Sequence, residues 1–313
     1  MRGTSLVYSS HNRSPYLHDH FIAQRALRGR ENKRILFLPM SGMLRNGDEM
    51  ERQDYEWGTF KWFFRQYERY GLECFPFFYT SGLRHEDVQK LWYWLATSEV
   101  VILGGGHSQL GLSRYKELGA KFDGEWGKFG RILHERRERG LLTCGFSAGA
   151  DQLCEWLFRK RWDDHSDTSG FGLVRNTMVS MHHEPSRNDE LAEAAHKMRH
   201  NMVFGLPNDS GLYSDHGVLS SGLHWQVIEF VIDGSWDLPS DGWHIKTRHG
   251  AKIDHVSADG WHWSFSGGDY MVRIQSGDGS FNQAWMTSGG RLLHYWTREP
   301  SRYHSIEEVL ASH

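Results

Sequence analysis

The chain has 313 residues, of which 39% are hydrophobic and 14% aromatic, and its formal net charge is −3. This length and apolar content exclude a disordered chain and predict a globular protein with a substantial core. The near balance of charge excludes broad electrostatic binding to nucleic acid or to an anionic membrane, so we expect neither as a partner.

Alternating short apolar runs and helical stretches between residues 33 and 215 predict a mostly parallel sheet flanked by helices. The apolar runs are too uniform for strands of a half-exposed antiparallel sheet. We therefore expect a doubly wound α/β fold. The predicted strands are residues 34–39, 74–79, 100–103 and 141–144, and the predicted helices are residues 54–70, 86–97, 128–139 and a stretch that runs through Trp156.

The pattern changes after about residue 220, where Gly, Asp and Ser separate the apolar runs. Asp-Gly-Trp-His occurs twice, at 241–244 and 259–262, and Asp-Gly is typical of tight turns. We therefore predict an α/β domain over 1–220 and a β-rich, Trp- and His-rich extension over 221–313. Its expected strands are residues 226–232, 270–275 and 292–297, and a last helix is expected over 305–311.

No segment is apolar for long enough to predict a signal peptide or a membrane span. The three cysteines, Cys74, Cys144 and Cys154, show no spacing typical of metal sites. These two features predict a cytoplasmic protein with reduced thiols.

The strongest functional signal is Gly-Phe-Ser-Ala-Gly at 145–149, between a predicted strand and a predicted helix. A sharp turn there projects the Ser147 hydroxyl from the sheet, and the free amides of the helix N-terminus can stabilise an oxyanion. The alternative is a tight turn that only needs small residues.

A second glycine turn, residues 104–106, also follows a buried strand and is expected at the same edge of the sheet. Glycine there offers a backbone N–H without side-chain obstruction. A phosphate-binding loop is the alternative, but neither a Lys-Ser/Thr pair nor Gly-x-Gly-x-x-Gly spacing supports it.

Together these motifs resemble the serine peptidases that include dipeptidase E and cyanophycinase, which share a class I glutamine amidotransferase-like fold. The resemblance covers about residues 6–219, in the family's order, although the family usually has Asn where His107 stands. The matching segments are residues 34–39, 101–106, 145–150, 165–167, 170–174, 181–183 and 204–209.

The resemblance implies an acyl-enzyme on Ser147, with His183 as general base and Asp167 as the acid that orients it. The histidine doublet leaves His182 as the neighbouring choice, and the motif favours His183. Asn208 stands where some members have Glu. The implied oxyanion amides are those of Gly105, Gly106 and Ala148, and the other candidate acids are Asp163, Asp164 and Asp209, any of which could instead cap a turn or helix.

Family members often recognise acidic side chains, so the resemblance implies α- or β-linked aspartyl peptides as substrates. Arg187 is the candidate for bidentate recognition of a carboxylate, although many such residues are simply solvated. His107, Gln109 and His182 are the other residues expected to bind the substrate. No cofactor is expected.

Histidine and tryptophan gather in the extension. The spacing of His244, His249, His255 and His262 matches no metal-ligand pattern, so no metal is expected. The tryptophans could stack on a ligand, but they more often staple a small sheet or a subunit interface, and a homodimer is the expected oligomer. These tryptophans are Trp225, Trp236, Trp243, Trp261, Trp263, Trp285 and Trp296.

Two other functions compete with the peptidase. A non-catalytic member of the same fold could bind peptide after losing its acid, which Asn208 suggests. A glutamine amidotransferase would share the fold but normally needs Cys at position 147.

Overall fold

The computed structural model describes residues 4–10, 16–42, 68, 71–159, 169–233, 250–275, 281 and 283–313. The predicted helix over 54–70 lies almost entirely outside these residues, and so does the first Asp-Gly-Trp-His copy at 241–244.

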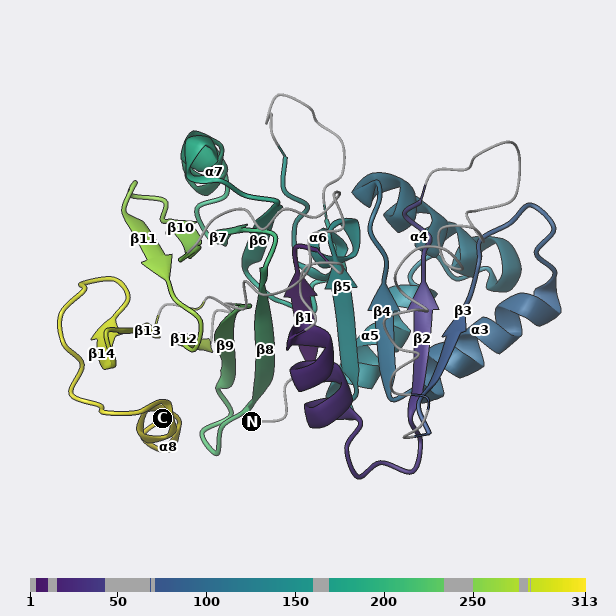
Figure 1. Cartoon of the computed structure of the whole chain (residues 1–313), viewed down its shortest axis with the longest axis horizontal. Coiled ribbons are helices and arrows are strands. Elements are labelled where there is room, and N and C mark those ends of the chain that lie inside the picture. The colour runs from purple at the N-terminus through teal and green to yellow at the C-terminus, as the bar shows by residue number, and fades with distance from the viewer. Residues whose placement is uncertain are drawn as a thin grey trace.

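Among the described residues, ten strands form one central sheet in the order β14-β13-β12-β9-β8-β1-β5-β4-β2-β3 (Figure 1). The half from β1 to β3 is parallel throughout. This half confirms the predicted α/β fold, and its strands are largely buried except at the outer edge, where residues 73–76 are exposed or half-buried. Its strands are β1 (Ser5–Tyr8), β2 (Arg34–Leu38), β3 (Glu73–Pro76), β4 (Val100–Leu103) and β5 (Leu142–Phe146).

The other half of the central sheet is antiparallel and begins with β8, which pairs with β1. Successive hairpins and connections then add the remaining strands outward. They are β8 (Ser210–Val218), β9 (His224–Ile232), β12 (Tyr270–Gln275), β13 (Gln283–Ser288) and β14 (Arg291–His294).

A second sheet has the strand order β11-β10-β7-β6. Here β6 (Thr177–Met181) and β7 (Met202–Leu206) are parallel, while β10 (Ile253–Val256) and β11 (His262–Phe265) are antiparallel. Strands from beyond residue 220 therefore continue both sheets, and the two-domain division remains a prediction drawn from composition.

Helices cover both faces of the parallel half, as the alternation of side chains along its strands requires. Leu36 and Leu38 of β2 join the core under the α-helices, whereas Ile35 and Phe37 pack beneath the π-helix η1 (Leu17–Ala26). The other helices are α3 (His85–Thr97), α4 (Ser108–Asp123), α5 (Lys128–Glu138), α6 (Ala148–Leu153), η3 (Pro185–Arg187), α7 (Asn188–Lys197) and α8 (Ile306–Ala311).

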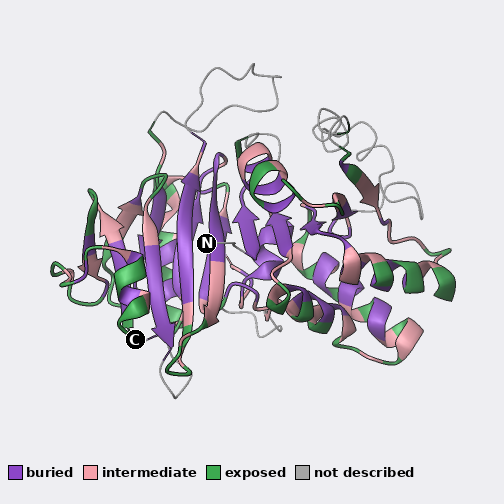
Figure 2. Cartoon of the chain, turned by 90° about the horizontal axis from the view of Figure 1, so that it is seen from below, coloured by how far each residue is buried: buried purple, intermediate pink, exposed green. Residues whose placement is uncertain are grey.

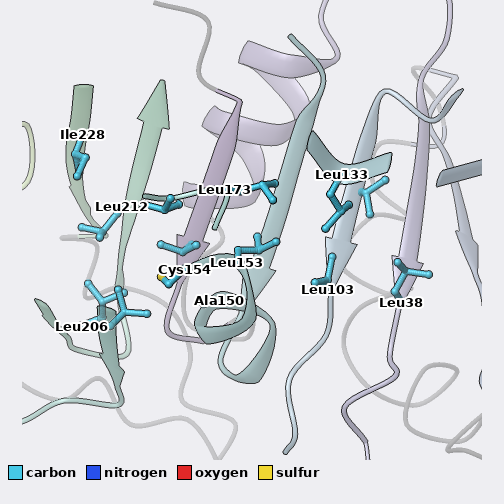
Figure 3. Packing of buried hydrophobic residues seen from close by; sticks show 14 of the residues in the cluster. Leu38, Leu103, Leu133, Ala150, Leu153, Cys154, Leu173, Leu206, Leu212 and Ile228 are labelled. Atoms are coloured by element: carbon cyan, nitrogen blue, oxygen red, sulfur yellow. The ribbon is translucent and has the colours of Figure 1, made fainter. Parts of the chain in front are cut away.

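The main core runs without a break from the parallel strands to the antiparallel ones (Figure 3). It joins Leu38 and Leu103 to Leu206 of the second sheet and to Ile228 of β9. Burial of each such side chain contributes about 1.5–3 kcal/mol relative to exposure. Figure 2 shows the buried strands at the centre and the exposed helix faces outside. Both halves of the central sheet thus depend on one core.

Tryptophans of the C-terminal region differ in their burial. Trp285 of β13 is buried against Tyr303, Ile306 and Val309, so it joins α8 to the sheet. Trp261 and Trp296 are about half exposed, at 47% and 50%. The expected homodimer stays a prediction. No helix within the described residues combines the length and the apolar character needed to cross a membrane.

Candidate active site

Ser147 sits at the junction of β5 and α6 with φ 49° and ψ −117°, a backbone conformation that is rare for a residue with a side chain. Its N–H donates to the Tyr8 carbonyl at 3.0 Å, which ties the turn to β1. A Cβ on Gly145 would lie 2.3 Å from the Gly149 carbonyl oxygen, and one on Gly149 would lie 2.2 Å from that of Leu103. Both glycines of the motif are therefore required by close backbone packing.

The Ser147 hydroxyl faces His182, with 3.4 Å between Oγ and Nε2. His182 directly follows β6 and also has a positive φ, 51°. Its N–H donates to Ser9 Oγ at 2.8 Å, which helps to hold this turn. Strained backbone on both partners of one contact is typical of functional sites.

The other ring nitrogen of His182, Nδ1, lies 2.5 Å from Oδ1 of Asn208. Because the amide oxygen only accepts, Nδ1 is the donor, and the lone pair of Nε2 points to Ser147. Asn208 belongs to the turn between β7 and β8, and the N–H of Asp233 holds this turn through the Asp209 carbonyl at 2.7 Å. The site thus has a Ser–His–Asn chain of contacts.

His183, the histidine that the sequence motif favours, faces the interior and is fully buried. Its N–H continues the strand ladder by donating to Leu206 O at 2.9 Å, and this pairing turns the ring inward. Its Nε2 lies 2.9 Å from Asn188 Oδ1 and 3.5 Å from Asp254 Oδ2. The ring also packs on Gly205, where a Cβ would lie 2.3 Å from it. The structure therefore brings His182, and not His183, to Ser147.

Of the four candidate acids, only Asp209 belongs to the described residues. Asp163, Asp164 and Asp167 belong to the residues that the structure does not describe. Asp209 is buried next to Asn208. Asn208 occupies the orienting position at His182 Nδ1, and the only sequence signal for it was its place where some family members have Glu.

The two glycines predicted for the oxyanion hole have different neighbours, and only Gly105 lies against the Ser147 turn. A Cβ on Gly105 would lie 3.3 Å from Ser147 Cβ and 3.0 Å from the Phe146 ring. Gly106 has φ 131°, and a Cβ there would lie 2.1 Å from the Ser41 carbonyl oxygen. Ala148 is the first residue of α6, so its amide has no partner within the helix. Gly105 and Ala148 thus adjoin the nucleophile, Gly106 packs against Ser41, and the role of the three amides in an oxyanion hole stays a prediction.

The predicted substrate-binding residues fall into two groups. His107 and Gln109 are exposed at the N-terminus of α4. His107 Nδ1 accepts the Leu110 N–H at 3.3 Å, so the neutral ring carries its proton on the exposed Nε2. His182, the third, lies at Ser147 itself.

Arg187 has its donors engaged within the protein. Nε and Nη2 donate to Glu190 Oε2 at 3.0 and 2.6 Å, and Nη2 also reaches Ser180 Oγ at 3.2 Å. Nη1 donates to the carbonyls of Met181 and His182 at 3.1 and 3.2 Å. These bonds use all five N–H groups of the guanidinium. Arg187 therefore braces the His182 turn, a role that its sequence position did not reveal.

A buried carboxyl group lies one turn into the nucleophile helix. Asp151 accepts the Phe158 N–H at 2.7 Å, and its own N–H donates to Ser147 O at 3.2 Å. Burial raises the pKa of Asp151 to about 7, although hydrogen bonds from Phe158 and Ser108 act in the opposite direction. Next to it, the Gln152 side-chain amide donates to Ser108 O at 2.7 Å. These contacts join the nucleophile helix to the start of α4.

Histidines of the C-terminal region show structural contacts. His255 is buried and bonds to the Val203 carbonyl and the Tyr295 hydroxyl, each at 2.8 Å. His262 lies 3.3 Å from Asp254, while His244 and His249 fall outside the described residues. Within the described part of the chain, no group of three or more His, Cys, Asp or Glu side chains is arranged to hold a metal ion.

Comparison with known families places this geometry in context. The sequence profile of peptidase family S51 matches residues 6–220, more than half of the chain. The chain therefore belongs to peptidase family S51, which confirms the resemblance to dipeptidase E and cyanophycinase, and it is a serine-type peptidase.

Among solved structures, a peptidase from an acI-B1 Actinobacterium aligns with a TM-score of 0.53 and 17% identity. The alignment covers 84% of this chain and 95% of that chain. At this identity the likeness shows the fold alone. None of the curated proteins compared with the chain matches it.

Proposed function

We propose that the protein hydrolyses small peptides through an acyl-enzyme on Ser147, with His182 as the general base. In this reaction Ser147 Oγ bonds to the scissile carbonyl carbon while its proton passes to His182 Nε2. The C–N bond then breaks, and the imidazolium gives the proton to the leaving amine. Water, activated by the same imidazole, releases the acyl group. The contact between Ser147 Oγ and His182 Nε2 is the observation that carries the proposal.

The 3.4 Å separation of these atoms is longer than an ideal hydrogen bond. Catalytic contacts are often this loose before substrate binds, and they tighten in the reacting complex. In the proposed mechanism the amides of Gly105, Gly106 and Ala148 receive the oxyanion, and each such donor is worth about 3 kcal/mol in the transition state.

Asn208 gives the proposed triad an amide in place of a carboxylate. An amide oxygen fixes the tautomer and orientation of His182, as it does in Cys-His-Asn sites. It carries no negative charge, so it stabilises the imidazolium less than a carboxylate would. We therefore expect a slower acylation step than in a Ser-His-acid site.

For the substrate, we propose peptides with an acidic residue, including α- and β-linked aspartyl peptides. The 16-residue helix α4 begins beside the Ser147 turn, and its N-terminus favours an anionic group. The exposed Nε2–H of His107 can donate to the same group. Arg187 does not support this specificity, because its donors are engaged within the protein.

The first test of the proposal is labelling with a fluorophosphonate probe, which phosphonylates an activated serine. The wild type should be labelled, and Ser147→Ala should not. Hydrolysis of a dipeptide panel with Asp, β-Asp, Asn and Ala in the first position should then favour the acidic members. Unchanged labelling of Ser147→Ala would overturn the assignment of the nucleophile.

The amide at position 208 also favours a second function, a peptide-binding protein with little or no turnover. This alternative predicts that wild type and Ser147→Ala bind dipeptides equally well by calorimetry, while neither the probe nor any dipeptide reacts. Reaction of the probe with Ser147 would be sufficient to exclude this alternative.

A further inference from the structure

A small hollow opens at the end of the central sheet opposite Ser147. Its volume is about 100 Å³, and its walls include Arg137, Arg175, His216, Trp225 and Phe281. In the register of β8 and β9, Ser210 pairs with Ile232 near the nucleophile, whereas Val218 pairs with His224 beside the hollow. At about 3.3 Å per residue, the nine residues of β8 separate these two ends by roughly 25 Å. The hollow is thus distinct from the site at Ser147.

Two guanidinium groups, those of Arg137 and Arg175, line this hollow together with the carboxylate of Glu138. The Arg137 side chain is only 13% exposed, and it donates through Nε and Nη2 to the Glu138 carboxylate, which is 65% exposed, at 3.3 and 3.1 Å. Arg175 is exposed and donates through Nη1 to the neutral amide of Gln275 at 3.2 Å. Each of these two side chains thus keeps N–H groups that other described residues do not engage.

A third guanidinium lies directly beneath the hollow. Arg273 is 1% exposed, and it stacks 4.7 Å from the centre of the Phe281 ring. Its hydrogen bonds go to neutral groups, the carbonyls of Arg175 and Asn176 and the side chains of Thr177 and Gln226. The Glu155 carboxylate acts on it only through its charge, without a hydrogen bond between the two side chains among those described. A buried cation held by neutral partners leaves a positive potential at the floor of the hollow.

The pKa values of Arg137 and His216 are consistent with this positive potential. Burial and the neighbouring Arg175 lower the pKa of Arg137, while Glu138 opposes them. Burial and Arg137 lower the pKa of His216, again against Glu138. Positive groups here disfavour one another's charge, which an added anion would relieve.

We propose that this hollow is a second binding site, for one small anion whose carboxylate or phosphate oxygens bind to Arg137 and Arg175. The planar guanidinium offers paired N–H groups at the spacing of carboxylate and phosphate oxygens. A volume of about 100 Å³ is well below that of drug-sized sites, which begin near 300 Å³, so the ligand is a single small anion. The rings of Trp225 and Phe281 provide apolar walls for its carbon atoms.

Thermal unfolding of Ser147→Ala protein tests this inference, because that variant removes turnover and leaves the hollow intact. Aspartate and inorganic phosphate are titrated separately at constant ionic strength. A saturable rise in Tm with aspartate alone identifies a carboxylate site, and one with phosphate alone identifies a phosphate site. A saturable rise with both supports the shared anion chemistry.

Substitution of the two arginines tests whether the anion binds in the hollow. Arg175→Gln and Arg137→Gln, each in the Ser147→Ala background, should weaken the apparent Kd at least tenfold. The matched control Arg291→Gln makes the same charge change on an exposed residue of β14 and should leave Kd unchanged. Arg175 is exposed, so its replacement spares the core. No saturable shift with either anion, or equal Kd values in both hollow variants and the control, would overturn the proposal.

Discussion

The two sheets contribute different halves of the candidate site. The central sheet carries Ser147 and the glycine turn, each at the end of a parallel strand. The second sheet carries His182 after β6, and Asn208 follows β7 (Figure 1). The first half depends on local motifs of five or fewer residues. The second half depends on how β6, β7 and β10 pair. This pairing determines which of the two adjacent histidines faces Ser147.

Alanine substitution of each histidine in turn should give the largest difference between the two parts of the site. His182→Ala should lower kcat by roughly 10³-fold, since it removes the proposed general base while Ser147 and the glycine turn remain. Stopped-flow or steady-state hydrolysis of the best dipeptide measures this loss.

His183→Ala serves as the matched variant. It removes a fully buried ring and one of the two histidines beside Asp254, so it should reduce the free energy of unfolding by about 2–4 kcal/mol. Below its Tm the folded variant should keep most of its kcat. The assignment fails if His183→Ala abolishes turnover at unchanged stability and His182→Ala does not.

Substitution of Asn208 sharpens the contrast between an amide and a carboxylate. Asn208→Ala should lower kcat by about 10²-fold, because His182 loses its orientation. Asn208→Asp should raise kcat by about tenfold or more, since a carboxylate also stabilises the imidazolium. The pair is compared by kcat at pH 7 to 8. A slower Asn208→Asp enzyme would contradict the proposed contact with His182 Nδ1.

Arg187→Gln probes the bracing of the His182 turn. Loss of its bonds to the carbonyls of Met181 and His182 should lower kcat about tenfold for acidic and neutral dipeptides alike, with little change in KM. A direct role in substrate recognition would instead raise KM for acidic dipeptides alone. Separate kcat and KM values for the two substrate classes distinguish these results.

Asp151 should make stability depend on pH. Its pKa is raised from 3.8 to about 7 in the folded chain, so the folded state binds the proton more tightly than the unfolded state. This contribution is fully present below about pH 4 and is lost as pH rises through about 7. Urea unfolding from pH 4 to pH 8 should show the decline, and Asp151→Asn should flatten it. An unchanged slope in Asp151→Asn would assign the dependence to other groups.

Strands β2 to β5 could be predicted from sequence because parallel sheets favour continuous apolar runs, whereas β1, which is only four residues long, was not predicted. Helix α4 was not predicted, since Gly111 and Gly119 interrupt its pattern. Each glycine has a packing reason: a Cβ would lie 2.2 Å from Ser41 Oγ or 2.3 Å from the Glu125 carbonyl oxygen, respectively. Strands β6, β7 and β10 are short and pair with distant segments, so local pattern gave no sign of them.

The residues of the site also differ in how well they could be predicted from the sequence. Ser147 and the glycine turn are fixed by local backbone demands that a motif displays. The choice between His182 and His183 depends on a positive φ and on a ladder bond to Leu206, neither of which a sequence shows. Arg187 has a suitable position for substrate, but in the folded chain its donors are engaged by the Glu190 carboxylate, the Ser180 hydroxyl and two backbone carbonyls.

The pairing of β10 with β7 has a consequence for biosynthesis. His183, next to the proposed base, contacts Asp254, and the N–H of Asp233 holds the turn that contains Asn208. During translation the Gly-Phe-Ser-Ala-Gly segment emerges more than a hundred residues before Asp254 does. The nascent polypeptide thus exposes its serine well before the strand that pairs with β7 beside the histidine turn has been synthesised.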